Sequence, residues 1–129
     1  MRPTIVLLAG SDSRRELERR LRRAGSYTEG DVFDHLDVGE CRFGIDLSNR
    51  VLSDYAEPEL KELVDRLGEF DSILVEYSDV SCLRPLLKSV LAGLTGFIDT
   101  NFGELIDYVD VLERFDREPS WDWSVPQPG

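Results

Sequence analysis

Three aspartates stand directly after, or at the end of, segments whose composition predicts β-strands: Asp12, Asp79 and Asp99. If these strands were parallel neighbours, the aspartates would converge at the carboxyl edge of the sheet, where open α/β sheets bind ligands. Carboxylate oxygens are hard ligands that suit Mg²⁺. The alternative is that each aspartate caps a helix or forms a turn, which is the commonest role of Asp at such positions. We favour capping and turn formation, and keep a Mg²⁺-dependent enzyme that uses the three aspartates as an alternative function.

Residues suited to nucleophilic or redox chemistry are few. The chain has one histidine, His35, which argues against a Ser–His or Cys–His catalytic pair. Cys41 and Cys82 lie far apart without C-x-x-C spacing, so we expect free, mostly buried thiols in a reducing compartment. No glycine-rich phosphate-binding pattern follows residues 4–9. The sequence therefore assigns no catalytic residue and no cofactor.

The segment that organises the chain is a predicted strand–helix–strand unit within residues 71–101. Residues 72–77 are rich in β-branched and aromatic side chains, and residues 82–92 carry an apolar stripe at helical spacing. Residues 96–99 then read as a short second strand. This succession is typical of a right-handed crossover between parallel strands.

A β-hairpin is predicted where residues 32–38 and 41–47 flank the pair Gly39–Glu40. A two-residue turn that begins with glycine suits a tight hairpin and fixes its register. That register places Val38 opposite Cys41 and continues along one apolar face. Asp34 is the polar exception on that face, so we expect it either at the end of the sheet or against a polar partner.

The remaining patterns complete the predicted architecture. Strands are expected at residues 4–9, 32–38, 41–47, 72–77 and 96–99, and helices at residues 13–24, 58–67, 82–92 and 108–117. Residues 1–129 form one domain, in which the tail at about 124–129 is expected to fray. The expected fold class is α/β or α+β. It consists of a single mixed sheet with one antiparallel hairpin at about 32–47 and βαβ crossovers, packed with about four helices.

The net charge of −11 is unevenly distributed along the chain. Residues 1–25 carry +4, with seven arginines, whereas residues 26–129 carry −15. Such an acidic body repels nucleic acid and membranes and attracts basic partners, although solubility alone also accounts for acidity. The arginine-rich helix is read as a solvated basic face, with an anion-binding or partner-binding face as the alternative. No apolar run approaches the length of roughly 20 residues that a membrane span needs.

Several segments of the C-terminal half resemble small acidic bacterial proteins. They are residues 73–79, residues 98–103, the acidic helix that follows, and the alternating Trp121–Asp122–Trp123. Many such proteins look like immunity proteins of toxin systems, which bind and block a partner toxin. The resemblance implies a cytoplasmic, non-enzymatic binding protein.

The function expected from the sequence is therefore that of a non-catalytic cytoplasmic binding protein, an immunity-type inhibitor of a basic toxin domain. The protein itself is expected to be a monomer or a weak homodimer. Its candidate binding residues are the aromatic anchors Tyr55, Tyr108, Trp121 and Trp123 and the acidic rim Glu104, Asp107, Asp110 and Glu113.

Two alternatives concern the tryptophans. Trp121 and Trp123 could instead clamp the C-terminus onto the core. Together with unprotected sheet edges, they could also support an oligomeric structural subunit.

Overall fold

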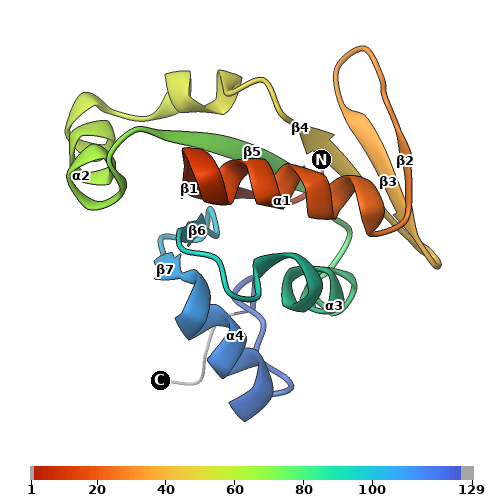
Figure 1. Ribbon diagram of the computed structural model, residues 1–129. Helices are drawn as coiled ribbons and strands as arrows, with labels where there is room; N and C mark the ends of the chain where they lie inside the picture. Colours follow the sequence, from red (N-terminus) through yellow and green to blue (C-terminus); the bar gives the residue numbers. More distant parts are fainter. Residues whose placement is uncertain (1, 126–129) are drawn as a thin grey trace.

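A single antiparallel sheet of seven strands, in the order β2-β3-β4-β5-β1-β6-β7, forms the framework of the protein (Figure 1). The computed structural model describes residues 2–125. The strands are β1 Thr4–Gly10, β2 Ser26–Thr28, β3 Asp34–Val38, β4 Cys41–Asp46, β5 Phe70–Glu76, β6 Phe97–Asp99 and β7 Leu105–Asp107. The helices are α1 Ser11–Arg23, the 3₁₀ helix η1 Arg50–Asp54, α2 Glu57–Leu67, α3 Val80–Leu91 and α4 Tyr108–Arg117.

β1 lies inside the sheet between β5 and β6. Its side chains alternate between two faces, and residues 5–9 are all fully buried. Ile5 and Leu7 belong to the main core, which also holds buried residues of α1, α3 and α4. Val6 and Leu8 belong to a second core, which Leu63 of α2 and residues of η1 complete. Both faces of β1 are covered, which explains why its sequence is a continuous apolar run.

The predicted mixed sheet with βαβ crossovers between neighbouring strands is wrong, and the α+β alternative describes the fold. β5 and β6 flank α3 as expected, but each pairs with β1 in the antiparallel sense. The N-terminal strand therefore occupies the place between them. The strand–helix–strand pattern located the elements correctly, but it carried no information about a strand inserted from more than 60 residues earlier.

The predicted hairpin is confirmed. β3 and β4 pair Val38 with Cys41, Leu36 with Phe43 and Asp34 with Ile45, and Gly39 in the turn has φ +59. The strands are shorter than expected, beginning at Asp34 and ending at Asp46. Asp34 does face polar partners: its carboxylate accepts hydrogen bonds from the Tyr27 hydroxyl at 2.5 Å and from the Gly30 N–H at 3.1 Å.

All four predicted helices are present, with changes at their first residues. α1 begins at Ser11 rather than at residue 13, and α3 begins at Val80 rather than at residue 82 and is capped by Asp79. α4 begins at Tyr108 as predicted, and Asp107 caps it, since its carboxylate accepts the Val109 N–H at 2.8 Å. The strands β2 and β7 were not predicted, because three residues are too few to show an alternating pattern.

The C-terminal segment folds back onto the core. Trp121 and Trp123 pack against the ring of Phe115, and the Trp123 indole N–H donates to the Tyr77 hydroxyl at 3.0 Å. Both tryptophans are buried, as the clamping alternative expects. The tail at about 124–129 was expected to fray. Ser124 lies in a turn, in which its N–H donates to the Asp122 carboxylate at 2.8 Å. Residues 126–129 lie outside the described part of the chain.

Candidate functional site

The three aspartates proposed as Mg²⁺ ligands do not form a cluster. Asp12 lies beyond the C-terminal end of β1, whereas Asp79 follows β5 and Asp99 ends β6. Because β5 and β6 run antiparallel to β1, their C-terminal ends lie at the opposite edge of the sheet from Asp12. Within residues 2–125, no group of three or more His, Cys, Asp or Glu side chains could hold a metal ion. The alternative of a magnesium site at these three aspartates is therefore wrong, because it depended on parallel strands.

Asp79 and Asp99 instead have structural partners, as the capping and turn interpretation expected. The Asp79 carboxylate accepts the Cys82 N–H at the start of α3. Hydrogen bonds from the Ser81 hydroxyl and from backbone N–H groups lower the pKa of Asp79. Asp99 accepts the Asn101 N–H at 2.9 Å and the Tyr55 hydroxyl at 2.7 Å.

An acidic groove of about 290 Å³ lies between α2 and the turn that joins β6 to β7. We call it the acidic groove; its lining residues are Tyr55, Glu59, Glu62, Leu63, Asp99, Gly103, Glu104 and Leu105. Four of these carry carboxylates, and none of the lining residues is Lys or Arg. Leu63 is 3 % exposed and Leu105 is 41 % exposed, so the carboxylates flank an apolar floor that solvent partly reaches.

One wall of the groove is the β6–β7 turn, whose backbone is held by several hydrogen bonds. The Thr100 N–H donates to the Glu104 carbonyl at 3.1 Å, and the Asn101 side-chain amide donates to the Thr4 carbonyl at 3.0 Å. Asn101 and Gly103 both have positive φ, 63 and 87 respectively, which this tight turn requires. These bonds place Glu104 at the mouth of the groove without engaging its carboxylate.

The other wall is the first half of α2, preceded by Tyr55. Glu59 accepts the Ala56 N–H at 3.0 Å, and Glu62 forms an ion pair with Arg66 at 3.0 Å. Burial, reinforced by the hydrogen bond to Asp99, raises the pKa of Tyr55 well above that of a free tyrosine. Tyr55 therefore remains a neutral hydrogen-bond donor, and the negative charge of the groove resides on its four carboxylates.

An apolar hollow of about 570 Å³ lies beside the groove, also bordered by the β6–β7 turn. Its lining includes Pro3, Phe33 and Phe102, and Phe102 is 49 % exposed. Exposed aromatic rings beside charged residues are common at protein interfaces. The turn therefore presents carboxylates and an aromatic side chain to adjacent parts of the surface.

The structure brings together two of the eight residues expected to bind a partner, Tyr55 and Glu104. Tyr108, Trp121 and Trp123 are only 0 %, 3 % and 6 % exposed, so the folded surface does not present them as anchors.

The three other acidic candidates also lie outside the groove lining, on or next to α4. Asp107 caps the helix, and its carboxylate is already used by the Val109 N–H. Asp110 and Glu113 are exposed farther along α4.

Sequence reasoning missed Glu59 and Glu62. These two glutamates are three residues apart on α2, so they lie on one side of the helix, and they follow the predicted anchor Tyr55 closely in the sequence. This proximity to Tyr55 is the signal that could have found them. The sequence did not show that α2 would face residues 99–105, because no periodic pattern encodes that contact.

Two arginines of α1 donate hydrogen bonds to other segments of the chain, so this helix is only in part the solvated basic face that the sequence predicted. Arg14 donates to the carbonyls of Ser72 and Leu47 at 3.2 and 3.0 Å. Arg20 donates to the carbonyls of Val90 and Ala92, at the C-terminal end of α3. Two of the six arginines of α1 therefore join this helix to other helices and strands.

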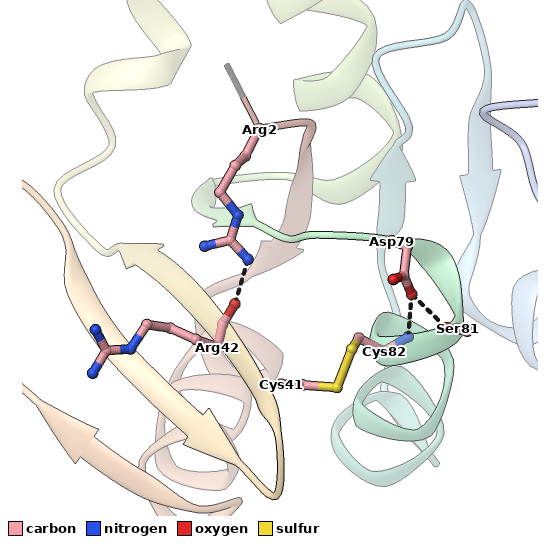
Figure 2. Close-up of a disulfide and its surroundings, with 6 residues drawn as sticks. All are labelled: Arg2, Cys41, Arg42, Asp79, Ser81 and Cys82. Carbon is pink, nitrogen blue, oxygen red and sulfur yellow. Dashed lines mark hydrogen bonds between the residues drawn. A yellow bond between two sulfur atoms is a disulfide. The ribbon is translucent and has the colours of Figure 1, made fainter.

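Cys41 and Cys82 form a disulfide, so the expected free thiols are wrong (Figure 2). The bond joins the first residue of β4 to the first turn of α3 across 41 positions of the sequence, with the two Cα atoms 5.9 Å apart. The long separation in sequence suggested that the two cysteines do not pair, but the β3–β4 hairpin brings Cys41 to the N-terminal end of α3.

Within residues 2–125, no helix is long and apolar enough to span a lipid bilayer.

Comparison with models of protein families, with curated proteins and with solved structures finds no match to this chain. What the protein does is therefore argued from its own residues.

Proposed function

We propose that this protein is a non-catalytic binding protein whose acidic groove receives a basic segment of a protein partner, in the manner of an immunity-type inhibitor of a basic toxin domain. The observation that carries the proposal is the composition of the groove: four carboxylates around an apolar floor, with no basic lining residue. A lysine or arginine side chain matches this arrangement, because an aliphatic stem can cover Leu63 and Leu105 while its charged head meets the carboxylates.

The charge of the whole chain supports the same direction of recognition. Residues 26–129 carry −15, and a field of this sign accelerates encounter with a positively charged partner. Most of the affinity would come from a few desolvated contacts rather than from the long-range field. Phe102, exposed beside the groove, is the aromatic side chain best placed to supply one of them.

A monomer is the proposed form of the unbound protein. The oligomeric alternative relied on Trp121 and Trp123, which are buried. The edge strands β2 and β7 have only three residues each, and short edges offer little backbone for pairing with another copy. Sedimentation at high protein concentration should give the mass of a single chain, and a concentration-dependent dimer would contradict this part of the proposal.

The compartment is also part of the proposal. Cytoplasmic location was expected from free thiols and from the resemblance to immunity proteins, and the Cys41–Cys82 disulfide removes the first of these premises. Disulfides persist in oxidising compartments and are rare in the reducing cytosol. We therefore place the protein outside the reducing cytosol. Alkylation of free thiols at the moment of cell lysis tests this, since a disulfide that is already present cannot be alkylated.

The test of function is capture of partners from the source cells by three variants with the same change in charge. Glu62→Lys/Glu104→Lys alters the groove, Asp110→Lys/Glu113→Lys alters α4, and Glu40→Lys/Asp65→Lys alters exposed residues outside both sites. A partner of the groove should bind the wild type, the α4 variant and the variant outside both sites, but not Glu62→Lys/Glu104→Lys. It should also dissociate as salt is raised. Equal loss from all three variants would indicate non-specific attraction.

An immunity-type inhibitor must also suppress an activity of the captured protein. The activity of that protein should fall when one equivalent of the wild type is added and persist with Glu62→Lys/Glu104→Lys. Binding without suppression of that activity would contradict the proposal of an inhibitor, and only the proposal of a binding protein would stand.

A further inference from the structure

The Cys41–Cys82 disulfide lies at the surface, where a small reagent can reach it. Both cysteines are half-buried and line a hollow of about 200 Å³, whose walls include Val38, Pro85 and Leu86. A structural disulfide in a packed core would be shielded from thiols in solution, whereas exposed disulfides are often labile or regulatory.

The disulfide holds the turn end of the β3–β4 hairpin, which has no backbone pairing with β5. Of the described residues of β4, only Gly44, Ile45 and Asp46 pair with β5, so the turn end of the hairpin extends past its neighbour. Figure 2 shows two of the contacts that hold this end: the disulfide to α3, and the hydrogen bond that the Arg2 guanidinium donates to the Arg42 carbonyl at 2.6 Å.

The two sulfur atoms have different surroundings. Cys82 lies in the first turn of α3, a helix of 12 residues, where backbone N–H groups and the helix dipole stabilise a thiolate. The Asp79 carboxylate at the same turn opposes that charge, but the Ser81 hydroxyl and the Cys82 N–H already bond to it. Cys41 belongs to a strand, so once the bond opens its sulfur is no longer held at the end of α3, whereas Cys82 remains part of that helix. The Cys82 sulfur is therefore the better leaving group.

We propose that the Cys41–Cys82 disulfide is a reversible redox switch: a dithiol reductant opens it in the folded protein, Cys82 leaves as the thiolate, and the turn end of the β3–β4 hairpin is released from α3. This inference does not depend on the acidic groove and goes beyond the proposed function.

The exchange proceeds in two steps. One thiolate of the dithiol attacks the Sγ of Cys41, a mixed disulfide forms, and the electron pair of the broken bond passes to the Sγ of Cys82. The second thiolate of the reductant then attacks the reductant sulfur that is bonded to Cys41, and Cys41 leaves as the thiolate. The reductant leaves as a cyclic disulfide after giving two electrons, and both cysteine sulfurs exchange protons with water.

The rest of the hairpin is held by contacts other than this bond. Phe43 and Leu36, which lie farther along the hairpin, are fully buried in the main core, and β3 remains paired with β2 and β4. Opening the disulfide should therefore loosen only the residues near the turn, about 38–42, together with the first turn of α3.

The test is reduction of the folded wild-type protein with dithiothreitol, followed by alkylation, mass spectrometry and hydrogen exchange. The bond should open at least about tenfold faster than the protein unfolds globally, with unchanged far-ultraviolet circular dichroism. Amide exchange should accelerate at least about tenfold at residues 38–42 and 80–83 and stay constant in β1 and β5. Oxidised dithiothreitol should reverse both changes.

The matched control is Cys41→Ser/Cys82→Ser, in which dithiothreitol should not alter hydrogen exchange. Glutathione has one thiol, so a single molecule cannot complete the second step, and with limiting glutathione the adduct should form on Cys41. Opening only at the rate of global unfolding, or loss of protection throughout the sheet, would overturn the switch. An adduct found mainly on Cys82 would overturn the assignment of the leaving sulfur.

Discussion

Tyr55 and Asp99, which are 44 positions apart in the sequence, are joined by a hydrogen bond of 2.7 Å from the phenol to the carboxylate. The bond fixes the segment before α2 against the end of β6, and both side chains line the acidic groove. The shape of the candidate site therefore depends on a contact that also stabilises the fold.

Replacing this phenol should weaken the fold. Tyr55→Phe removes the donor but leaves Asp99 with the Asn101 N–H, so we expect the free energy of unfolding to fall by about 1–2 kcal/mol. Urea denaturation of Tyr55→Phe, Asp99→Ala and the double variant should give a coupling energy of about 1 kcal/mol. A coupling near zero would mean that the bond contributes nothing in solution.

The tyrosines should make the protein sensitive to alkali. Burial is the largest cause that raises the pKa of Tyr27, Tyr55, Tyr77 and Tyr108, the four tyrosines of the chain. Because the neutral phenol is favoured in the folded state, its stabilising contribution is complete below a pH of about 10 and is lost as the pH rises above that value. The ultraviolet absorbance of ionised tyrosine should rise only together with the loss of the circular dichroism of the folded protein. A rise in the still-folded protein at a pH of about 10 would contradict the burial of these side chains.

The buried tryptophans should behave as core residues. Trp123→Ala should lower the free energy of unfolding by about 3–5 kcal/mol, because the side chain packs in an aromatic cluster with Phe115 and Trp121. Trp123→Phe keeps a ring but removes the donor to Tyr77, and should cost about 1–3 kcal/mol. As a control, Val32→Ala at a 66 % exposed position should change stability by less than about 0.5 kcal/mol. Unchanged stability in Trp123→Ala would restore the tryptophan to the list of possible surface anchors.

Asp107 should act mainly as a helix cap. Asp107→Ala removes the acceptor for the Val109 N–H, so the free energy of unfolding should fall by about 1 kcal/mol. Asp107→Asn keeps a capping side chain and should cost only a few tenths of a kcal/mol. If the asparagine variant were as unstable as the alanine variant, the charge rather than the cap would be the stabilising feature.

Local patterns predicted the elements well but not their neighbours. The hairpin register followed from the Gly39–Glu40 turn and the alternation around it, both of which are local properties. The place of β1 between β5 and β6 depends on contacts across most of the chain, and no spacing in the sequence encodes them. The same limit applies to the disulfide, whose partners come from a hairpin and a helix distant in sequence.

The candidate site was predicted only in part for the same reason. Tyr55 and Glu104 were chosen from residue type and charge, and the groove contains both. Trp121 and Trp123 were chosen because tryptophan is enriched at interfaces, but their rings complete the core beside Phe115. Composition therefore indicated the sign of the surface charge, and the fold decided which side chains face solvent.

The central claim is that the acidic groove binds basic segments specifically, and a nuclear magnetic resonance titration of the full chain with an arginine- and lysine-rich peptide tests it most directly. We expect saturable shifts at residues 55–63 and 99–105 that weaken as salt is added, persist in Glu40→Lys/Asp65→Lys and disappear in Glu62→Lys/Glu104→Lys. Shifts spread over every acidic part of the surface, with equal effects of the two variants, would contradict the claim.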